Sequence, residues 1–188
     1  MRLCVYCSSS SEVAACYKEA ARELGRLIAT HHHELIYGAG NIGLMGELAS
    51  AVKAGGGRVV GVIPRRLAEY GLGYDLADEM IITETMAERK SEMERRAEAF
   101  IGLPGGIGTL EELLQVLTLK QLRYLSGPVV ILNTAGFYDH LIIHMQRLVD
   151  EAFMRVEFLN LYHVSADATE ALRFIETYRE PDLPQKWF

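Results

Sequence analysis

A glycine-rich segment in the middle of the chain stands directly before two carboxylates. Residues 104–112 read PGGIGTLEE, so a proline, three glycines and a threonine precede Glu111 and Glu112. Glycines at a turn into a helix let backbone N–H groups face a ligand, and the positive end of the helix dipole favours an anion there. The segment therefore predicts an anion site, such as one for a phosphate group, with carboxylates beside it that are suited to acid–base chemistry.

A second glycine-rich segment, YGAGNIGLMG, occupies residues 37–46. Gly38, Gly40 and Gly43 match the GxGxxG spacing of a dinucleotide-binding turn. That turn, however, normally follows the first strand and is completed by an acidic residue that binds a ribose, whereas the strand after this one ends in VIP. Neither glycine-rich segment has the lysine of a Walker loop. The two segments together favour a phosphate-bearing small molecule that is smaller than a dinucleotide.

Glu112 has two open interpretations at this point. Thr109 and Glu112 have the T-x-x-E spacing of a capping box, in which each side chain bonds to a free backbone amide at the helix start. In that case Glu112→Gln should keep most of the activity. If Glu112 is instead catalytic, the same substitution should remove activity, and in both cases we expect little change in stability. Arg89 and Lys90, in the helical segment 85–96, are also open to two interpretations, as site residues or as part of a solvated helix face.

The rest of the chain alternates short apolar segments with helical patterns. Strands are expected at 3–7, 34–38, 58–64, 99–106, 128–132 and 161–165, and helices at 13–30, 43–54, 85–97, 108–125, 137–152 and 167–178. Short apolar strands are typical of a parallel sheet that is buried on both faces. The βα alternation favours a doubly wound sheet with its ligand site at the carboxyl ends of the strands. The sequence thus predicts one Rossmann-like α/β domain over residues 1–188.

Composition excludes several classes of protein. A chain of 188 residues that is 49% hydrophobic can bury a sizeable core as one domain. The net charge of -6 and a pI near 5.5 argue against a nucleic-acid or membrane-surface binder. No apolar run approaches the ~20 residues of a membrane span, and no signal peptide opens the chain. We therefore expect a cytoplasmic protein with no nucleic-acid or membrane partner.

The cysteines and histidines do not indicate a metal site. Cys4 and Cys7 are three apart on a predicted strand, so their side chains point to opposite faces and favour buried structural thiols. The three histidines at 31–33 lie between a helix and a strand, where a solvated loop is favoured over a metal site. His140 and His144 have ligand-compatible spacing on a helix, but no HExxH pattern surrounds them. We therefore predict no metal and no other cofactor.

In order and spacing, the segments YGAGNIGLMG, GVIP, TETMAERKSEM and LPGGIGTLEE resemble the LOG (Lonely Guy) family of cytokinin riboside 5'-monophosphate phosphoribohydrolases. The resemblance runs from the first strand to about residue 152. It implies a Rossmann-type dimer that hydrolyses the N-glycosidic bond of a purine nucleoside monophosphate, such as AMP or an N6-substituted AMP, to free base and ribose 5-phosphate. Many relatives have an older label, lysine decarboxylase, which no convincing pyridoxal-phosphate lysine supports here.

The resemblance also implies roles for individual residues. Arg89 and Glu112 are the expected catalytic pair, with Glu112 stabilising an oxocarbenium-like ribose or activating water and Glu111 as the alternative carboxylate. The expected substrate-binding residues are Gly38, Gly40, Gly43, Met45, Lys90, Pro104, Gly105, Gly106, Gly108, Thr109, Glu111 and Thr118. A non-catalytic nucleotide or molybdenum-cofactor carrier on a similar fold is the alternative function. A nicotinamide-dependent oxidoreductase is a third, weaker one.

Two features bear on specificity and assembly. The family usually has three consecutive glycines where this chain has Gly38, Ala39 and Gly40, so an alanine methyl is expected to narrow the pocket or to exclude a positive φ at that residue. The helices at 108–125 and 137–152 have more apolar side chains than one sheet-facing stripe needs, which indicates a homodimer. The side chains concerned are Leu119, Leu122, Tyr124, Ile143 and Met145.

Overall fold

The computed structural model describes residues 1–185 and contains one sheet of seven strands in that part of the chain. The strands are β1 (Arg2–Tyr6), β2 (Glu34–Tyr37), β3 (Arg58–Pro64), β4 (Glu79–Thr83), β5 (Ala99–Gly102), β6 (Val129–Leu132) and β7 (His163–Ser165). Their order is β4-β3-β2-β1-β5-β6-β7, and every neighbouring pair is parallel. The predicted doubly wound parallel sheet is therefore confirmed.

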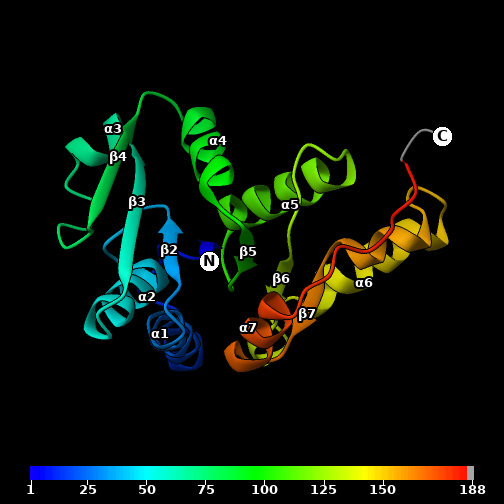
Figure 1. Ribbon diagram of the computed structural model, residues 1–188, viewed down its shortest axis with the longest axis horizontal. Helices are drawn as coiled ribbons and strands as arrows, with labels where there is room; N and C mark the ends of the chain where they lie inside the picture. The colour runs from blue at the N-terminus through cyan, green and yellow to red at the C-terminus, as the bar shows by residue number, and fades with distance from the viewer. Residues whose placement is uncertain (186–188) are drawn as a thin grey trace.

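Helices cover both faces of the sheet (Figure 1). They are α1 (Ala15–Thr30), α2 (Gly43–Ala54), α3 (Arg65–Glu69), α4 (Met86–Arg96), α5 (Ile107–Gln121), α6 (Asp139–Asp150) and α7 (Ala168–Glu176), with short 3-10 turns η1 (Thr134–Gly136) and η2 (Val156–Leu161). Side chains of α1, α2 and α7 pack on one face of the sheet, and those of α4, α5, α6 and η2 pack on the other. None of the helices in residues 1–185 has the length and apolarity to span a bilayer.

The chain changes direction across the sheet between β1 and β5. Strands β1 to β4 are added outward on one side, after which the chain returns to place β5 on the other side of β1. At such a switch point the loops after the two central strands run in opposite directions and leave a crevice at their carboxyl ends. The loop after β1 begins at Cys7, and the loop after β5 contains the PGGIG segment. The topology thus places the glycine-rich loop at the crevice.

The 3-10 turns aside, the elements not expected from the sequence are α3 and β4. Strand β4 has only five residues at the edge of the sheet, pairs with β3 alone, and is mostly half-buried. A strand with one neighbour and partial burial lacks the continuous apolar pattern by which the inner strands were recognised. Helix α3 has five residues and no buried side chain, so it lacks an amphipathic pattern as well. The predicted strand over 99–106 is shorter than expected and ends at Gly102.

The thiols lie as predicted, whereas the histidine segment does not. Cys4 and Cys7 are buried, belong to core clusters on opposite faces of the sheet, and are unbridged, as is the exposed Cys16. His32 is exposed, but the side chain of His33 is only 8% exposed and hydrogen-bonds to Glu176. The expectation of a fully solvated loop at 31–33 is therefore wrong for His33. The two histidines of α6, at 140 and 144, are both exposed.

Candidate active site

A cavity of about 610 Å³ opens at the carboxyl ends of the central strands. Its walls come from the end of β1 and the serine loop that follows, from the glycine-rich turn after β2, from α3 and α4, and from the start of α5. The lining also contains Gly106 and Gly108 at the start of α5 and two side chains of opposite charge, Arg89 and Glu112. The cavity is thus large enough, and polar enough at one side, for a nucleotide-sized ligand. The apolar wall includes Ile42, Ile63, Leu67, Leu72 and Met86.

The amino terminus of α5 faces this cavity without a side-chain cap. Gly106 is the N-cap residue, and no side chain in the described residues accepts from the first-turn amides there. Gly106, Ile107 and Gly108 line the cavity, and all three are exposed. The first-turn N–H groups of a helix have no partner within the helix, so here they are free to bind an anion.

Of the two interpretations of Glu112, the capping box with Thr109 is wrong. Because α5 begins at Ile107 and has Gly106 as its N-cap, Thr109 lies inside the first turn and cannot cap the helix. The side chain of Thr109 is buried and packs on Gly105, where a Cβ would lie 2.1 Å from the Thr109 hydroxyl oxygen. Glu112 is consequently free to turn toward α4.

Arg89 and Glu112 form a buried ion pair between α4 and α5. Nη1 of Arg89 donates to Oε1 of Glu112 at 2.5 Å, and Nε of Arg89 donates to the carbonyl of Val62 at 3.1 Å. Both side chains are about one-tenth exposed. Burial raises the pKa of the Glu112 carboxyl above its ordinary value, and the charge of Arg89 opposes that rise. A carboxylate whose pKa is raised in a cleft is a candidate general base with a stated physical cause.

Two glycines make room for this arrangement. A Cβ on Gly38 would lie 1.9 Å from Nη2 of Arg89, so only glycine lets the guanidinium pass beneath the turn after β2. Gly43 has φ +61°, and a Cβ there would lie 2.4 Å from the backbone of Ser9. Glycine at position 43 therefore allows the start of α2 to approach the serine loop after β1, which closes that side of the cavity.

A second ion pair lies beside the first but outside the cavity lining. Lys90 donates to Glu111 and, at 2.6 Å, to Oε1 of Gln115, while Gln115 donates to Glu94 at 2.5 Å. Glu111 is about half exposed. This network ties α4 to α5 on the solvent side of the buried pair. It explains Lys90 and Glu111 without contact to a ligand in the cavity.

The structure brings most of the expected site residues together. Pro104 and Gly105 line a smaller neighbouring cavity of about 170 Å³, which also includes Gly106. Thr118 is exposed on α5, and its hydroxyl donates to the carbonyl of Leu114. It lies outside both linings, as do Gly43, Lys90 and Glu111. The expected residues that line the larger cavity are Gly38, Gly40, Met45, Arg89, Gly106, Gly108, Thr109 and Glu112.

Several lining residues were not expected from the sequence. Tyr6 and the serines at 8–10 line the cavity from the end of β1, and the apolar wall was not expected at all. The serine run directly after the first strand is the signal that could have indicated the loop, because that strand is central in a doubly wound sheet. The apolar wall had no such signal, since its residues come from separate segments of the chain.

Ala39 does not behave as expected from the glycine-rich pattern. It adopts φ +61°, so the methyl group does not exclude a positive φ, and it is fully buried. Its side chain packs against β3, where a Cβ on Gly61 would lie 2.7 Å from the Ala39 Cβ. Ala39 is not among the residues that line the cavity within residues 1–185. The methyl group therefore fills space beneath the turn instead of narrowing the pocket.

Comparison with known proteins identifies the family of the chain. The model of a family described as "Possible lysine decarboxylase" matches residues 45–175. Cytokinin riboside 5'-monophosphate phosphoribohydrolase LOG5 of Arabidopsis thaliana is 40% identical over 178 residues, which are 95% of this chain and 78% of that protein. LOG7 of the same plant, also named a cytokinin riboside 5'-monophosphate phosphoribohydrolase, is 41% identical over 184 residues, or 98% of this chain and 84% of that protein.

Solved structures with the same fold include cofactor carriers. A molybdenum cofactor carrier protein from Chlamydomonas reinhardtii is 25% identical with a TM-score of 0.73, covering 93% of this chain and 95% of that one. A molybdenum cofactor binding protein from Rippkaea orientalis has a TM-score of 0.72 at 19% identity, covering 94% and 95%, which shows a shared fold alone. The much higher identity to the phosphoribohydrolases over nearly the whole chain decides the family. The chain belongs to the LOG family of cytokinin riboside 5'-monophosphate phosphoribohydrolases.

Proposed function

We propose that this protein is an N-glycosidase that hydrolyses purine nucleoside 5'-monophosphates, with N6-substituted AMP as the preferred class, to free base and ribose 5-phosphate. In a host that uses such bases as cytokinins, this reaction releases the active hormone. The observation that supports the proposal most directly is the buried Arg89–Glu112 pair, which lines the same cavity as the uncapped amino terminus of α5. A carboxylate and an anion site in one cavity are what a phosphorylated glycoside requires.

The phosphate is proposed to bind at the start of α5. The amides of Gly106, Ile107 and Gly108 lack side-chain partners among the described residues and lie at the positive end of the helix dipole. Glu112 lies farther along the same helix, about 7.5 Å from Ile107 in the direction of the axis. That rise is of the order of the separation between the 5'-phosphate and the anomeric carbon of a nucleotide. A phosphate held at the helix start therefore places the ribose beside the carboxylate.

The base is proposed to lie against the apolar wall. Ile42, Leu67, Leu72 and Met86 come from separate elements and offer this side of the cavity no hydrogen-bonding side chain. An apolar surface of this kind favours an alkyl substituent on the N6 atom over a bare amino group by roughly 0.8 kcal/mol per buried methylene. The proposal therefore favours N6-alkylated AMP over AMP itself.

The proposed reaction breaks the bond between the anomeric carbon and the purine nitrogen. The electron pair of that bond leaves with the base, and the ribose passes through an oxocarbenium-like state that the Glu112 carboxylate stabilises. Water then forms the new C–O bond while Glu112 accepts its proton, which ends on the departing base. Arg89 fixes the orientation of Glu112 through Nη1, and its Nη2 remains to stabilise the phosphate or the leaving base. Binding energy from the phosphate positions the sugar for this step.

The test is a panel of nucleoside monophosphates incubated with purified protein, with free base measured by chromatography. We expect base release from AMP, faster release from N6-alkylated AMP, and almost none from the matching nucleosides. Equal turnover of adenosine and AMP would refute the phosphate anchor. Tight binding of AMP with no release of base would refute hydrolysis.

A non-catalytic carrier is the second candidate, because solved molybdenum cofactor carriers share the fold. A carrier needs the anion site but has no use for a carboxylate whose pKa burial raises beside a guanidinium. The same panel separates the two functions. A carrier retains its ligand unchanged, whereas the hydrolase releases a base.

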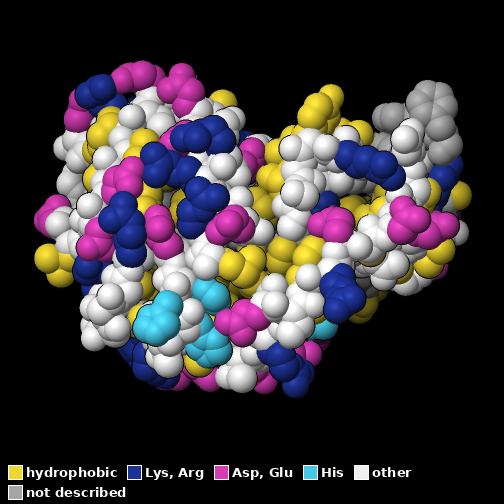
Figure 2. Space-filling view, in the orientation of Figure 1, with side chains coloured by type: hydrophobic (Ala, Val, Ile, Leu, Met, Phe, Trp, Pro, Cys, Tyr) yellow, Lys and Arg dark blue, Asp and Glu magenta, His cyan; other side chains and the backbone are white. Residues whose placement is uncertain are grey.

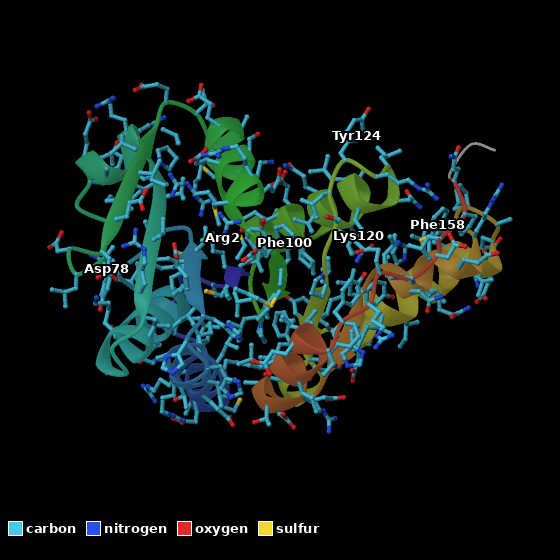
Figure 3. All side chains as sticks on the ribbon, viewed as in Figure 1. Arg2, Asp78, Phe100, Lys120, Tyr124 and Phe158 are labelled. Atoms are coloured by element: carbon cyan, nitrogen blue, oxygen red, sulfur yellow. The ribbon has the colours of Figure 1, made fainter. Side chains whose placement is uncertain are left out.

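We also propose that the protein works as a homodimer. Of the five apolar residues that suggested a dimer, Met145 is buried in the core of the chain itself and so cannot contribute, and Leu119 and Leu122 are half-buried. Tyr124 and Ile143, by contrast, are 80% and 64% exposed. Figure 3 shows Tyr124 projecting away from the sheet from the loop after α5, and hydrophobic side chains gather over α5 in Figure 2.

Thr118 supports the same assembly. It lies on the exposed side of α5 and outside the cavity of its own chain, so a contact with the nucleotide would require a second copy of the protein. The proposed dimer would thus give Thr118 the ligand contact that the family resemblance implies.

A cytoplasmic location is proposed from the thiols. Cys4, Cys7 and Cys16 are all free. Proteins that keep every cysteine reduced are typical of compartments where glutathione and thioredoxin prevent disulfides.

A further inference from the structure

We propose that His31, His33 and Glu176 form a binding site for one zinc-like divalent transition metal ion, remote from the nucleotide cavity. Their ligand atoms all lie within 4.8 Å of one another. Nδ1 of His31 is 2.8 Å from Oε1 of Glu176, and Nε2 of His33 is 2.9 Å from the same oxygen. Two imidazoles and one carboxylate are a donor set that zinc takes in proteins, with a fourth position left for water.

The geometry needs little adjustment to hold an ion. Ligand atoms around a tetrahedral zinc ion with bonds of about 2.0–2.1 Å lie about 3.3 Å apart. The ligating nitrogens of His31 and His33 now lie 2.8 Å and 2.9 Å from Oε1 of Glu176, so each has to move away from that oxygen by less than about 1 Å. Figure 2 shows histidine side chains gathered in one patch beside an acidic side chain. The three donors already converge from two segments that are distant in sequence.

The backbone fixes the two histidines in this position. His31 is the C-cap residue of α1, and His32 follows with φ +56°. The amides of His31, His32 and His33 bond to carbonyls in the last turn of α1, which closes the helix with a left-handed residue. That turn places the side chains of His31 and His33 on the same side, with His32 exposed between them. The preorganised turn lowers the ordering cost of binding an ion.

Two helix ends favour a positive charge at this point. Helix α1 ends at Thr30 and α7 ends at Glu176, and the two helices pack against each other. The carboxyl end of a helix has a partial negative charge that stabilises a nearby cation. The side chain of His33 is 8% exposed, so one ligand is shielded from water while the other two remain accessible to an entering ion. Nδ1 of His33 lies 3.2 Å from the amino nitrogen of Met1. A ring that binds the ion through Nε2 has its proton on Nδ1, so the amino group has to be neutral to accept from it.

The site would clamp α7 to α1 and has no part in the proposed hydrolysis. His33 directly precedes β2 at the start of that strand, whereas the nucleotide cavity lies at the carboxyl ends of the strands. We therefore expect the ion to raise the stability of the folded chain without changing the turnover of nucleotides.

The experiment uses tag-free protein freed of metal with a chelator, then dialysed against Zn²⁺ and measured for metal content and melting temperature. We expect one equivalent to bind, with a rise in Tm of roughly 5 to 10 °C when free Zn²⁺ is about a hundred times the dissociation constant. Affinity should fall by about 10-fold to 100-fold or more in His31→Ala and in Glu176→Gln. Both substitutions lie at partly exposed side chains, so both variants should fold, and base release should be unchanged in each.

Matched controls come from the other histidines. His32→Asn keeps a residue type that tolerates the left-handed conformation and should bind Zn²⁺ like the parent protein. The double variant His140→Ala/His144→Ala removes the exposed pair on α6 and should also bind normally. Absence of saturable binding to the parent protein overturns the proposal, because the cluster would then be a set of hydrogen bonds only. Loss of binding in the α6 double variant with full binding in His31→Ala overturns it as well.

Discussion

The guanidinium of Arg89 on α4 lies 2.5 Å from the carboxylate of Glu112 on α5, and both groups are buried. The two residues are 23 positions apart, and β5 runs between their helices. The pair therefore joins two helices of one layer at the crevice where the proposed substrate binds. Because the two charges are paired and buried, a substitution at either residue should change both the rate of base release and the stability of the fold.

Replacing Glu112 by Gln should reduce base release by roughly 100-fold or more, because an amide can neither accept the proton of water nor stabilise an oxocarbenium. The sequence alone predicts little change in stability, whereas the buried ion pair leads us to expect a loss. The amide leaves the Arg89 charge buried without a counter-charge, so the free energy of unfolding should fall by about 3–5 kcal/mol. Rate and thermal melting are measured together. Glu111→Gln is the matched control, since Glu111 is half exposed. Near-normal turnover in Glu112→Gln would show that Glu112 is not the catalytic carboxylate.

The rate of base release should depend on the protonation of Glu112. Burial raises the pKa of this carboxyl, so the rate should rise with pH along a limb whose midpoint lies above the ordinary glutamate value of about 4.3. Arg89 opposes the rise, so Arg89→Gln should move the midpoint to higher pH in the residual activity. The folded state binds the extra proton, so this carboxyl contributes less to stability as pH rises through the same window.

The control for the pH profile is Arg95→Gln, which removes an exposed partner of Glu92. This substitution should leave the midpoint of the pH–rate profile unchanged. An unmoved midpoint in Arg89→Gln contradicts the assignment of the limb to Glu112.

Gly38→Ala should disrupt the ion pair although Arg89 and Glu112 themselves are not substituted. The new Cβ would lie 1.9 Å from Nη2 of Arg89, so the guanidinium has to leave its position. A displacement of about 1 Å in a catalytic group can reduce the rate by roughly 100-fold, and we expect a loss of that order in kcat/KM. Gly73→Ala is the control, because its Cβ would meet only the end of the Met80 side chain at 3.7 Å. Full activity in Gly38→Ala would show that catalysis does not depend on the observed position of the Arg89 guanidinium.

Ala39 and Gly61 should be coupled in stability. A Cβ on Gly61 would lie 2.7 Å from the Cβ of Ala39, so Gly61→Ala should lower stability by about 1–3 kcal/mol through overpacking. Ala39→Gly relieves a positive φ and loses one buried methyl, so alone it should change stability by less than about 1 kcal/mol. The double variant should recover a large part of the loss seen in Gly61→Ala. Chemical denaturation of the four proteins measures this, and a double variant no more stable than Gly61→Ala argues against the contact.

The exposed apolar side chains over α5 and α6 should mediate self-association. Light scattering at micromolar concentration should give twice the mass of the chain, and Ile143→Asp should shift the mass toward that of a monomer, because a charge replaces a 64% exposed apolar side chain. Leu76→Asp is the control, since Leu76 is similarly exposed but lies in the segment before β4. A parent protein that is monomeric throughout would reject the dimer.

The sequence predicts the buried parts of this fold well because their patterns are local. Helix α2 and strand β3 begin and end at the expected residues, since Gly43 and Pro64 mark boundaries that do not depend on the rest of the chain. Strand β4 was missed because it is an edge strand that is mostly half-buried, and its assignment depends on pairing with β3.

The site was predicted in its residue types but not in its partnerships. The T-x-x-E spacing at Thr109 and Glu112 is real, yet α5 already starts at Ile107, before the position that a Thr109 cap would give it. The contact between Arg89 and Glu112 depends on how α4 and α5 pack over β5, which no local spacing determines. The positive φ of Ala39 likewise depends on the space beside Gly61, which lies in β3.

The order of the strands also determines when the site comes into existence during synthesis. Residues 1–98 can pair β1 through β4, but one edge of β1 stays open until β5 emerges from the ribosome. Arg89 belongs to the part made first, and Glu112 belongs to the part made afterwards. A nascent chain therefore has the guanidinium without its counter-charge until the second half of the sheet is added. Closing the free edge of β1 and forming the charged pair both require residues beyond position 98, so a chain truncated there has neither a complete sheet nor the charged pair.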